Sequence, residues 1–239
     1  MTERIVLPEM LTAGYDAVVI LDTETTGISF QRDHIIELAA LRLEGRGDTL
    51  TCAGEMDDLI LLPDGKRVPP FIENLTGITN DRLAAEGRPA EESCRRFAGL
   101  LEGEQLLIAA YNAHFDLSFL FYFLRRFEQA ALLRKARFLD LLTVYKDRRD
   151  YPHKLENAIT AYGLEDQVQN SHRAIDDTWA AARVAEAMAR EEDDLDRYIN
   201  LFGFNPKYGV EGRRISSVTY RPQPYGRARR LYELAALDK

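Results

Sequence analysis

The chain has 239 residues, 46% of them apolar and 29% charged, and its formal net charge is −8. This composition suffices for one main buried core, and the negative charge argues against a protein that holds nucleic acid by bulk charge. No stretch approaches the ~18 consecutive apolar residues of a membrane helix, and the first ten residues lack the apolar segment of a secretory signal, so we expect a cytoplasmic protein without a membrane partner.

Apolar runs predict strands in the first quarter of the chain. Residues 17–21 are typical of a central strand buried on both faces, residues 35–45 indicate a second strand, and a third lies within 49–62. From Pro69 onward the pattern is helical, and residues 91–103 form an amphipathic helix that we expect to end at a glycine cap.

Strands and helices alternate farther along the chain. Residues 105–112 predict a buried strand that leads into an interior helix over 115–129, and a short strand is expected at 136–140. An alanine-rich helix over 174–192 follows two shorter helical segments. This order predicts an α/β fold in which helices pack on the faces of a mixed sheet.

An acidic run at residues 191–196 marks the main expected boundary. We therefore expect an N-terminal segment over 1–14, a main domain over 15–195 and a C-terminal extension over 196–239. Neither an internal repeat nor a low-complexity segment interrupts this organisation.

Acidic side chains interrupt the apolar pattern at three places. At the first, Asp22 and Glu24 follow the first strand and, being two residues apart on an extended chain, point to the same side. At the second, Asp116 lies in line with the apolar ridge of the helix that follows it. Taken alone, each has an ordinary explanation, as turn residues after a strand or as an acid favoured by the dipole at a helix start.

The third place is the helix over 174–192, whose packed seam includes Asp177 among alanine, valine and methionine residues. Asp176, its neighbour, falls on the polar face, where an acid is expected. His172 precedes Asp177 by five positions, about 140° around a helix of 3.6 residues per turn, so the two cannot share one helical face. We therefore expect His172 on the loop that enters the helix.

Four carboxylates turned toward one core would repel each other, by about 4 kcal/mol for a pair at ~4 Å in an effective dielectric of ~20. Divalent cations that bind through oxygen remove this repulsion. Acids with a nearby imidazole suit phosphodiester hydrolysis by two metal ions, in which the imidazole takes a proton from water. The sequence therefore predicts a metal-dependent hydrolytic site.

From about Tyr15 to Ala189 the chain resembles the DEDDh family of 3′→5′ exonucleases, of the polymerase III epsilon type. Three motifs carry the resemblance in the family's order: D-x-E-T-T-G at residues 22–27, N-A-x-F-D at 112–116 and H-x-A-x-x-D at 172–177. Any one motif is weak or moderate, whereas all three in this order are highly specific.

This resemblance implies a ribonuclease-H-like fold with a five-stranded mixed sheet flanked by helices. It also implies that Asp22, Glu24 and Asp177 bind two Mg²⁺ or Mn²⁺ ions directly. Asp116 would help to hold the second ion, and His172 would be the general base. The implied substrate is the 3′ end of single-stranded DNA or RNA, with DNA favoured, and the implied products are nucleoside 5′-monophosphates. A DNA polymerase or another replication or repair protein is the kind of partner that the resemblance suggests.

Residues close to these motifs have less definite roles. The loop of the first motif approaches the 3′-terminal nucleotide in relatives, which would make Thr25, Thr26 and Gly27 substrate-binding residues. The alternative is that they only shape a turn. His114 occupies the variable position of the second motif, and we interpret it as incidental.

The extension over 196–239 lies outside the resemblance. Between residues 205 and 230 it carries seven basic residues and one acid, interleaved with tyrosines such as Tyr208, Tyr220 and Tyr225. Aromatic and basic residues together can follow a phosphate backbone and stack on unpaired bases. Packing on the domain and docking of a partner protein are the other interpretations, and the sequence does not separate them.

Two other function classes fit parts of the pattern. A binding module would use the fold to hold nucleic acid or a polymerase without cutting, but that reading would be supported by the loss of a catalytic residue, and all five are present. A magnesium phosphatase of the D-x-D-x-T type has aspartate where this chain has Glu24, and it has no use for His172. Within the enzyme class, the alternative is an RNA-trimming 3′→5′ exoribonuclease.

Overall fold

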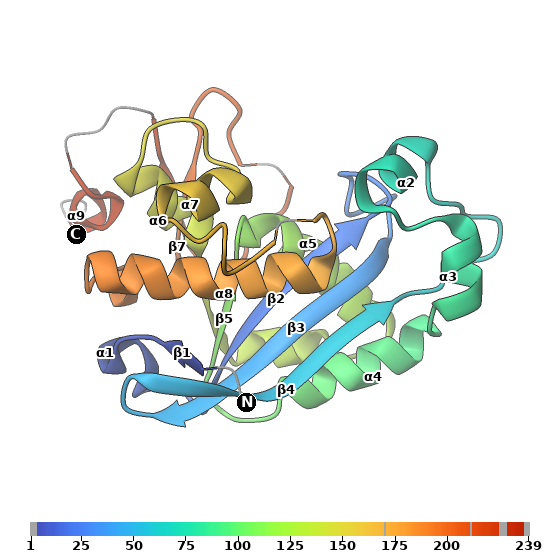
Figure 1. Ribbon diagram of the computed structural model, residues 1–239, viewed down its shortest axis with the longest axis horizontal. Helices are drawn as coiled ribbons and strands as arrows, with labels where there is room; N and C mark the ends of the chain where they lie inside the picture. Colours follow the sequence, from blue (N-terminus) through green and yellow to red (C-terminus); the bar gives the residue numbers. More distant parts are fainter. Residues whose placement is uncertain (1–3, 170, 211, 225–228, 237–239) are drawn as a thin grey trace.

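The computed structural model describes residues 4–169, 171–210, 212–224 and 229–236 (Figure 1). Within this part of the chain the main sheet has six strands in the order β1-β4-β3-β2-β5-β6. Their bounds are β1 (Arg4–Val6), β2 (Ala17–Thr25), β3 (Ile35–Arg46), β4 (Thr49–Leu59), β5 (Leu106–Ala110) and β6 (Ala136–Asp140). β2, β3 and β4 form an antiparallel meander, and β5 and β6 continue the sheet parallel to β2.

The α/β fold with a mixed sheet is confirmed, but the described sheet has six strands rather than the expected five. The additional strand, β1, pairs antiparallel with the start of β4 and places Ile5 opposite Leu50. Ile5, Leu7 and Leu11 are buried, so the N-terminal segment contributes to the core. Its apolar run is too short to indicate a strand without knowledge of the partner.

Helices join and cover these strands. Their bounds are α1 (Glu9–Thr12), α2 (Pro70–Thr76), α3 (Asn80–Glu86), α4 (Ala90–Leu100), α5 (Ala113–Arg126), α6 (Leu141–Arg148), α7 (Leu155–Ala161), α8 (Ala174–Glu191) and α9 (Leu231–Ala236), with 3₁₀ turns η1 (Ala130–Arg134) and η2 (Leu195–Tyr198). None of these described helices is long and apolar enough to cross a membrane.

The expected glycine cap of the helix over 91–103 is wrong, because α4 stops earlier, with Leu101 at its C-cap. Gly103 instead belongs to the turn before β5, where its φ is 129°. In that turn the Asp16 carboxylate accepts hydrogen bonds from the backbone N–H groups of Glu104 and Gln105. The turn before β5 is therefore held by Asp16, a residue distant in the sequence, and not by a glycine at the end of α4.

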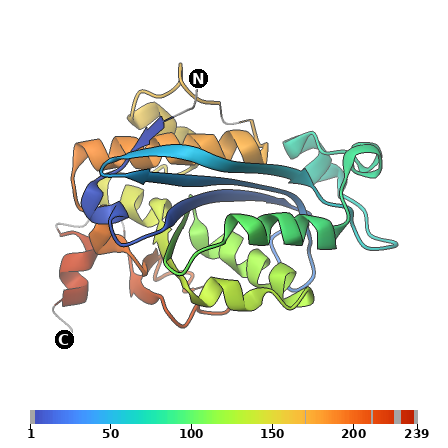
Figure 2. The same ribbon diagram turned by 90° about the horizontal axis from the view of Figure 1, so that it is seen from below.

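The core lies on both faces of the sheet because side chains alternate along each strand. Val18 and Ile20 of β2 belong to the cluster packed with α8, and Val19 and Leu21 belong to the cluster packed with α4 and α5. Figure 2 shows this layering, with α8 on one face and the green helices α4 and α5 on the other. Even-numbered residues of β2 therefore face α8.

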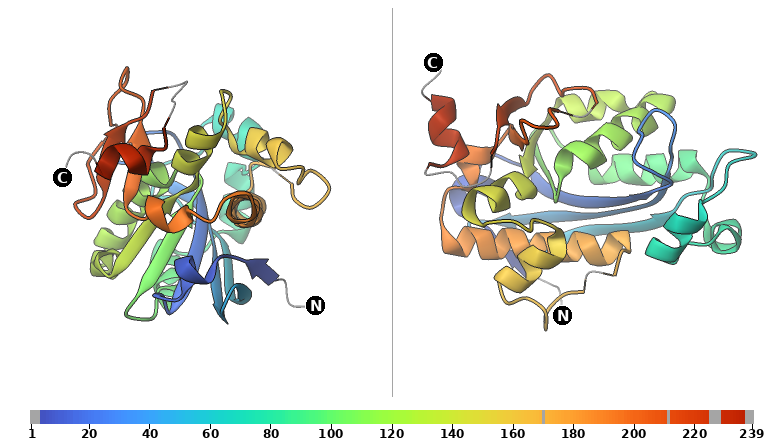
Figure 3. Two further views of the ribbon diagram at one scale, coloured as in Figure 1. Left: turned by 90° about the vertical axis from the view of Figure 1, so that its left-hand side faces the viewer. Right: turned by 90° about the horizontal axis from the view of Figure 1, so that it is seen from above.

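The C-terminal extension packs beside β6, on the side of the sheet that carries α5 (Figure 3, right). Within it, β7 (Leu201–Phe204) and β8 (Thr219–Pro222) form a parallel pair. Asn200 binds the edge of β6, since its N–H donates to the Phe138 carbonyl at 2.7 Å and its side-chain oxygen accepts from the Phe138 N–H at 2.8 Å. Packing on the domain is thus confirmed for this part of the extension. Tyr225 and Arg227 lie outside the described residues.

Candidate active site

Asp22 and Glu24 lie inside β2 and not after it, because the pairing with β3 continues as far as Thr25. The sequence indicated that the strand would end at Leu21, where the apolar run stops. Alternation along the strand turns both acids toward the face that α8 covers, and both are half-buried. Glu24 stands directly opposite Glu37 on β3.

The start of α8 brings Asp177 and His172 to these acids. Asp177 lies in the first turn and is only 7% exposed, whereas His172 is exposed on the loop before the helix, as expected. One ligand atom from each of Glu24, His172 and Asp177 lies within 4.8 Å of the other two. His172 has a φ of 55°, in the left-handed region that few non-glycine residues adopt.

Asp116 reaches the site from the opposite face of the sheet. It is buried in the first turn of α5, and the Thr23 hydroxyl, between the two acids of β2, donates to its Oδ1 at 2.7 Å. The start of α5 is fixed in turn by Asp140 at the end of β6, whose Oδ1 accepts from the Ala113 N–H at 3.0 Å. Residues of β2 and β6 therefore position Asp116 jointly.

Glu37 fixes the start of α8 to the sheet. Its carboxylate is fully buried, forms an ion pair with the Arg173 guanidinium and accepts from Arg173 Nε at 2.8 Å. Its second oxygen accepts from the backbone N–H of Ala174, the first residue of α8, at 2.8 Å. Because Glu37 is the cross-strand neighbour of Glu24, this anchor sets the position of His172 and Asp177 relative to β2.

Burial and mutual repulsion raise the pKa of four carboxyl groups. Burial, followed by the charges of Asp177 and Glu37, raises the pKa of Glu24 to about 8. Burial is also the largest cause for Asp177 and Asp116, and it raises each pKa to about 7. The pKa of Asp22 lies well above its usual range because of burial and then the charges of Asp116, Asp177 and Glu24. Protons and cations therefore compete for this cluster.

The residues present fit a divalent cation. Asp177 Oδ1 is buried and has no hydrogen-bond partner among the described residues, although buried polar atoms normally have one. Oxygen-bound divalent cations would satisfy this atom and offset the repulsion among the acids. Glu24 and Asp177, with the predicted ligand Asp22 on the same strand as Glu24, would supply carboxylate oxygens for this purpose.

Thr25, Thr26 and Gly27 shape the loop that follows β2. The Thr25 hydroxyl donates to the Gly27 carbonyl at 2.6 Å, and the Thr26 hydroxyl accepts from the His34 N–H at 3.0 Å. A Cβ at Gly27 would lie 2.5 Å from a carboxylate oxygen of Asp33, so a larger residue would have to displace that side chain. The turn role is thus present in the structure, and contact with a nucleotide stays a prediction.

His114 does more than the sequence indicated. Its Nδ1 is hydrogen-bonded to the Tyr220 hydroxyl at 2.8 Å, and the two rings meet edge to face. His114 is therefore a docking point for the C-terminal extension on α5. The only signal in the sequence was an unexplained histidine inside a motif and a tyrosine outside it.

An exonuclease family model, RNase_T, matches residues 19–185. The chain belongs to this exonuclease family. The matched region contains every predicted catalytic position, and the resemblance to DEDDh exonucleases is confirmed at the level of the family.

Relatives of the exonuclease domain include proteins of bacterial replication. It is 31% identical over 178 residues to the PolC-type DNA polymerase III of Thermotoga maritima. The matched segment is 72% of this chain and 12% of that protein. Identity to the DNA polymerase III subunit epsilon of Treponema pallidum is 29% over 163 residues, 67% of this chain and 71% of that subunit. The 3′-5′ exonuclease DinG of Bacillus subtilis is 38% identical over 109 residues, 45% of this chain and 11% of that protein. The chain thus spans a small part of the PolC-type and DinG proteins and most of the epsilon subunit.

Solved structures of exonuclease I share the fold of the exonuclease domain. One superposes with a TM-score of 0.66 at 22% identity and covers 77% of this chain and 43% of that one. Escherichia coli exonuclease I in complex with a dA16 oligonucleotide gives a TM-score of 0.65 at 20% identity, covering 77% and 42%. At these identities the likeness establishes the fold, which agrees with the predicted ribonuclease-H-like architecture.

Proposed function

We propose that the protein is a metal-dependent 3′→5′ exonuclease that releases nucleoside 5′-monophosphates from DNA ends. The observation that carries the proposal is the convergence of Glu24, His172 and Asp177 within 4.8 Å, with a buried oxygen of Asp177 left without a partner among the described residues. Membership of an exonuclease family supports the reaction type.

In the proposed site Asp22, Glu24 and Asp177 hold two Mg²⁺ or Mn²⁺ ions, and Asp116 contributes to the second. Two divalent ions in such a site stabilise the attacking and leaving oxygens of an in-line displacement at phosphorus. The carboxylates must be ionised to bind, so the raised pKa values of Glu24 and Asp177 make binding stronger toward alkaline pH.

His172 takes the proton from the attacking water in this scheme. Its ring is exposed, so it can pass the proton on to solvent, and an imidazole is suited to this exchange near neutral pH. The ion pair between Glu37 and Arg173 holds the neighbouring backbone, which keeps the imidazole beside the acids. We further propose that the turn at Thr25, Thr26 and Gly27 contacts the 3′-terminal nucleotide.

DNA is the proposed substrate because the relatives include polymerase III subunits. Exonuclease I, which shares the fold, has been solved with DNA oligonucleotides. The same relatives support a DNA polymerase or another replication or repair protein as partner, in proofreading or repair.

Digestion of 5′-labelled single-stranded DNA, duplex DNA and RNA of one sequence tests the proposal. Each substrate is incubated with Mg²⁺, Mn²⁺ or a chelator. We expect a ladder of labelled products that shortens from the 3′ end, faster on single-stranded DNA than on RNA, with no products in chelator. Early release of the label as a mononucleotide, or equal digestion in chelator, would contradict it.

A further inference from the structure

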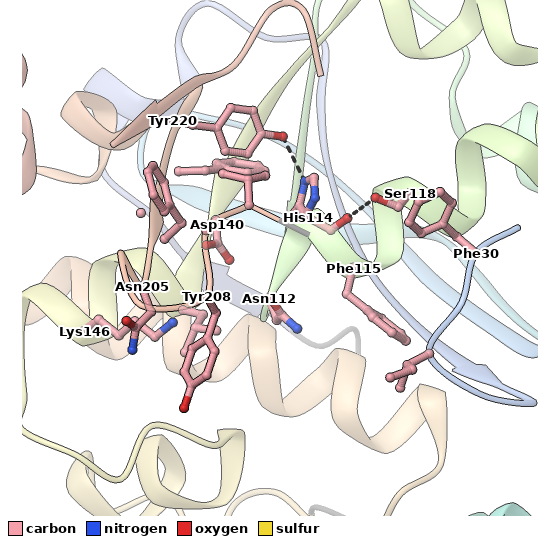
Figure 4. Close-up of a pocket in the computed structure, with 17 residues that line it drawn as sticks. Phe30, Asn112, His114, Phe115, Ser118, Asp140, Lys146, Asn205, Tyr208 and Tyr220 are labelled. Atoms are coloured by element: carbon pink, nitrogen blue, oxygen red, sulfur yellow. Dashed lines mark hydrogen bonds between the residues drawn. The ribbon is translucent and has the colours of Figure 1, made fainter. Parts of the chain in front are cut away.

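A cavity of about 240 Å³ adjoins the active site and is shared between the exonuclease domain and the extension. Asn112 and Phe115 line it from the start of α5, Lys146 from α6, and Asn205 and Tyr208 from the loop after β7 (Figure 4). Phe115 directly precedes the proposed metal-binding Asp116. The predicted catalytic acids are not among the residues that line the cavity, and it meets the active site through Asn112 and Phe115, at the start of the helix that carries Asp116.

Lys146 places a positive charge in this cavity without a direct contact partner. The residue is half-buried and has neither a hydrogen bond nor an ion pair with the part of the chain that the structure describes. Asp140 is the acid that lines the same cavity, but its carboxylate already accepts from the N–H groups of Ala113 and Thr143 and from the Thr143 hydroxyl. Burial lowers the pKa of Lys146 while Asp140 opposes the shift, as expected for a cation short of water. An anion in the cavity would supply the missing partner.

Aromatic rings also line the cavity, beside the charge of Lys146. Phe115 and Tyr208 point to the same side of it in Figure 4, and Tyr208 is 67% exposed although it is a large side chain. Lys207 lies over the Tyr208 ring, with its ammonium 5.2 Å from the ring centre. Exposed aromatic faces accompanied by cations are the usual means by which proteins hold unpaired bases and their phosphates.

The extension is held in the position that completes the cavity. Tyr220 of β8 binds His114 of α5, and the Arg214 guanidinium lies 5.5 Å from the centre of the Tyr220 ring. Gly212 packs so closely on Phe30, in the loop after β2, that a Cβ there would lie 2.4 Å from the ring. The extension therefore contacts both segments that flank the catalytic acids, and it lies outside residues 19–185, the region matched by the family.

We infer that this cavity binds a nucleotide that stays on the strand, on the 5′ side of the bond being cut. Phe115 and Tyr208 contact its base, and Lys146 binds a phosphate of the backbone. In the proposed function the acids and the turn after β2 receive the 3′-terminal nucleotide. The cavity is lined by Phe30 of that loop and by Phe115 of α5, so it is placed to receive the nucleotide that precedes the terminal one. This inference rests on the proposed function and extends it to a binding site made in part by the extension.

Two variants and two matched controls test the inference by binding alone. Tyr208→Ala and Lys146→Gln alter the cavity. Met10→Ala removes a side chain that is 74% exposed near the amino end of β2, and Lys135→Gln removes a surface charge just before β6, at the opposite end of that strand from Asp140. The probe is a fluorescein-labelled oligothymidylate in the presence of chelator, followed by fluorescence anisotropy.

We expect each cavity variant to weaken binding about tenfold, as is usual when one stacking or phosphate contact is lost, and the controls to bind as the unaltered protein does. Salt dependence separates the two contacts. Lys146→Gln lowers the slope of log affinity against log salt by about 0.7, the value for one phosphate contact on a single strand, whereas Tyr208→Ala leaves the slope as it is. Binding and slopes equal to those of the controls would overturn the inference.

A second measurement separates failure of the cavity from failure of the proposed function. The 4-nitrophenyl ester of thymidine 5′-monophosphate carries one nucleotide, and its nitrophenyl group takes the place of the preceding nucleoside without supplying the next backbone phosphate. For Lys146→Gln we therefore expect the ratio of kcat/KM on the oligonucleotide to kcat/KM on the ester to fall about tenfold. If the unaltered protein cleaves neither substrate, the proposed function fails, and binding in chelator still decides the cavity. If it cleaves both and the ratio does not move, the cavity inference fails alone.

Discussion

Two buried carboxylates close to each other, Glu37 and Asp177, differ in their hydrogen-bond partners. Glu37 is fully buried and its oxygens accept from Arg173 and from the N–H of Ala174. Asp177 is nearly as buried, yet its Oδ1 has no partner in the described structure, and its pKa is raised to about 7 chiefly by burial. A buried acid satisfied by the protein stabilises the fold. One left unsatisfied among other acids marks a place for a cation.

Asp177→Asn gives the largest expected loss of activity. Removal of a metal ligand costs several kcal/mol of transition-state stabilisation, so digestion of single-stranded DNA should slow by at least ~10³-fold. The melting temperature of the metal-free protein at pH 8 should rise, because one charge leaves a repelling cluster. Asp176→Asn, at the neighbouring half-buried acid, is the control and should keep most of the activity. If the Asp177→Asn variant is active, or is less stable than the unaltered protein without metal, then Asp177 does not differ from Glu37 in the way described.

His172→Ala should slow turnover by about 10²-fold, the usual contribution of a general base. Binding of Mn²⁺, followed by calorimetry, should change little if the imidazole moves protons and the carboxylates hold the ions. Loss of Mn²⁺ binding together with activity would show that His172 acts as a ligand instead.

Glu37→Gln should destabilise the fold and affect catalysis less. It leaves the partly exposed Arg173 without its buried partner, so we expect a loss of about 3 kcal/mol in the free energy of unfolding, measured by urea denaturation. Activity should fall by roughly tenfold, because small displacements of catalytic groups have costs of this order or larger. A variant that keeps its stability would show that Glu37 is not the anchor of α8.

A further prediction concerns the pH dependence of stability without metal. The folded pKa values of Glu24, Asp116 and Asp177 are about 7 to 8, above the ordinary carboxyl values near 4. Between these limits the folded state binds more protons than the unfolded state, so stability falls as pH rises from about 5 to 8. Melting curves in chelator should show this fall. Mg²⁺ or Mn²⁺ should raise the melting temperature more at pH 8 than at pH 5. Stability that rises with pH in chelator would contradict the raised pKa values.

Local patterns predicted the parts of the fold that depend on local sequence. Asp22, Glu24 and Asp177 were found because each breaks an apolar period that strand or helix packing imposes on its own neighbours. The loop position of His172 followed from helix geometry. In the structure Asp22 and Glu24 point to the same side of an extended chain and Asp177 is buried on a helix, as the strand and helix periods of the sequence predicted.

Features that depend on distant partners were not predictable in the same way. β1 forms only because β4 offers an open edge, and β2 extends through Asp22 and Glu24 because β3 continues to pair with it. The anchor between Glu37 and Arg173 joins residues 136 positions apart, and His114 meets Tyr220 across 106 positions. No local period records such pairs, so the sequence left Glu37 without a named partner and His114 without a role.

Anomalous diffraction from crystals grown with Mn²⁺ tests the central claim most directly. We predict manganese peaks between the carboxylates of Asp22, Glu24 and Asp177, with one bound by the Asp177 oxygen that has no partner in the described chain. Peaks only at other sites, with these carboxylates satisfied by water or by each other, would contradict the account.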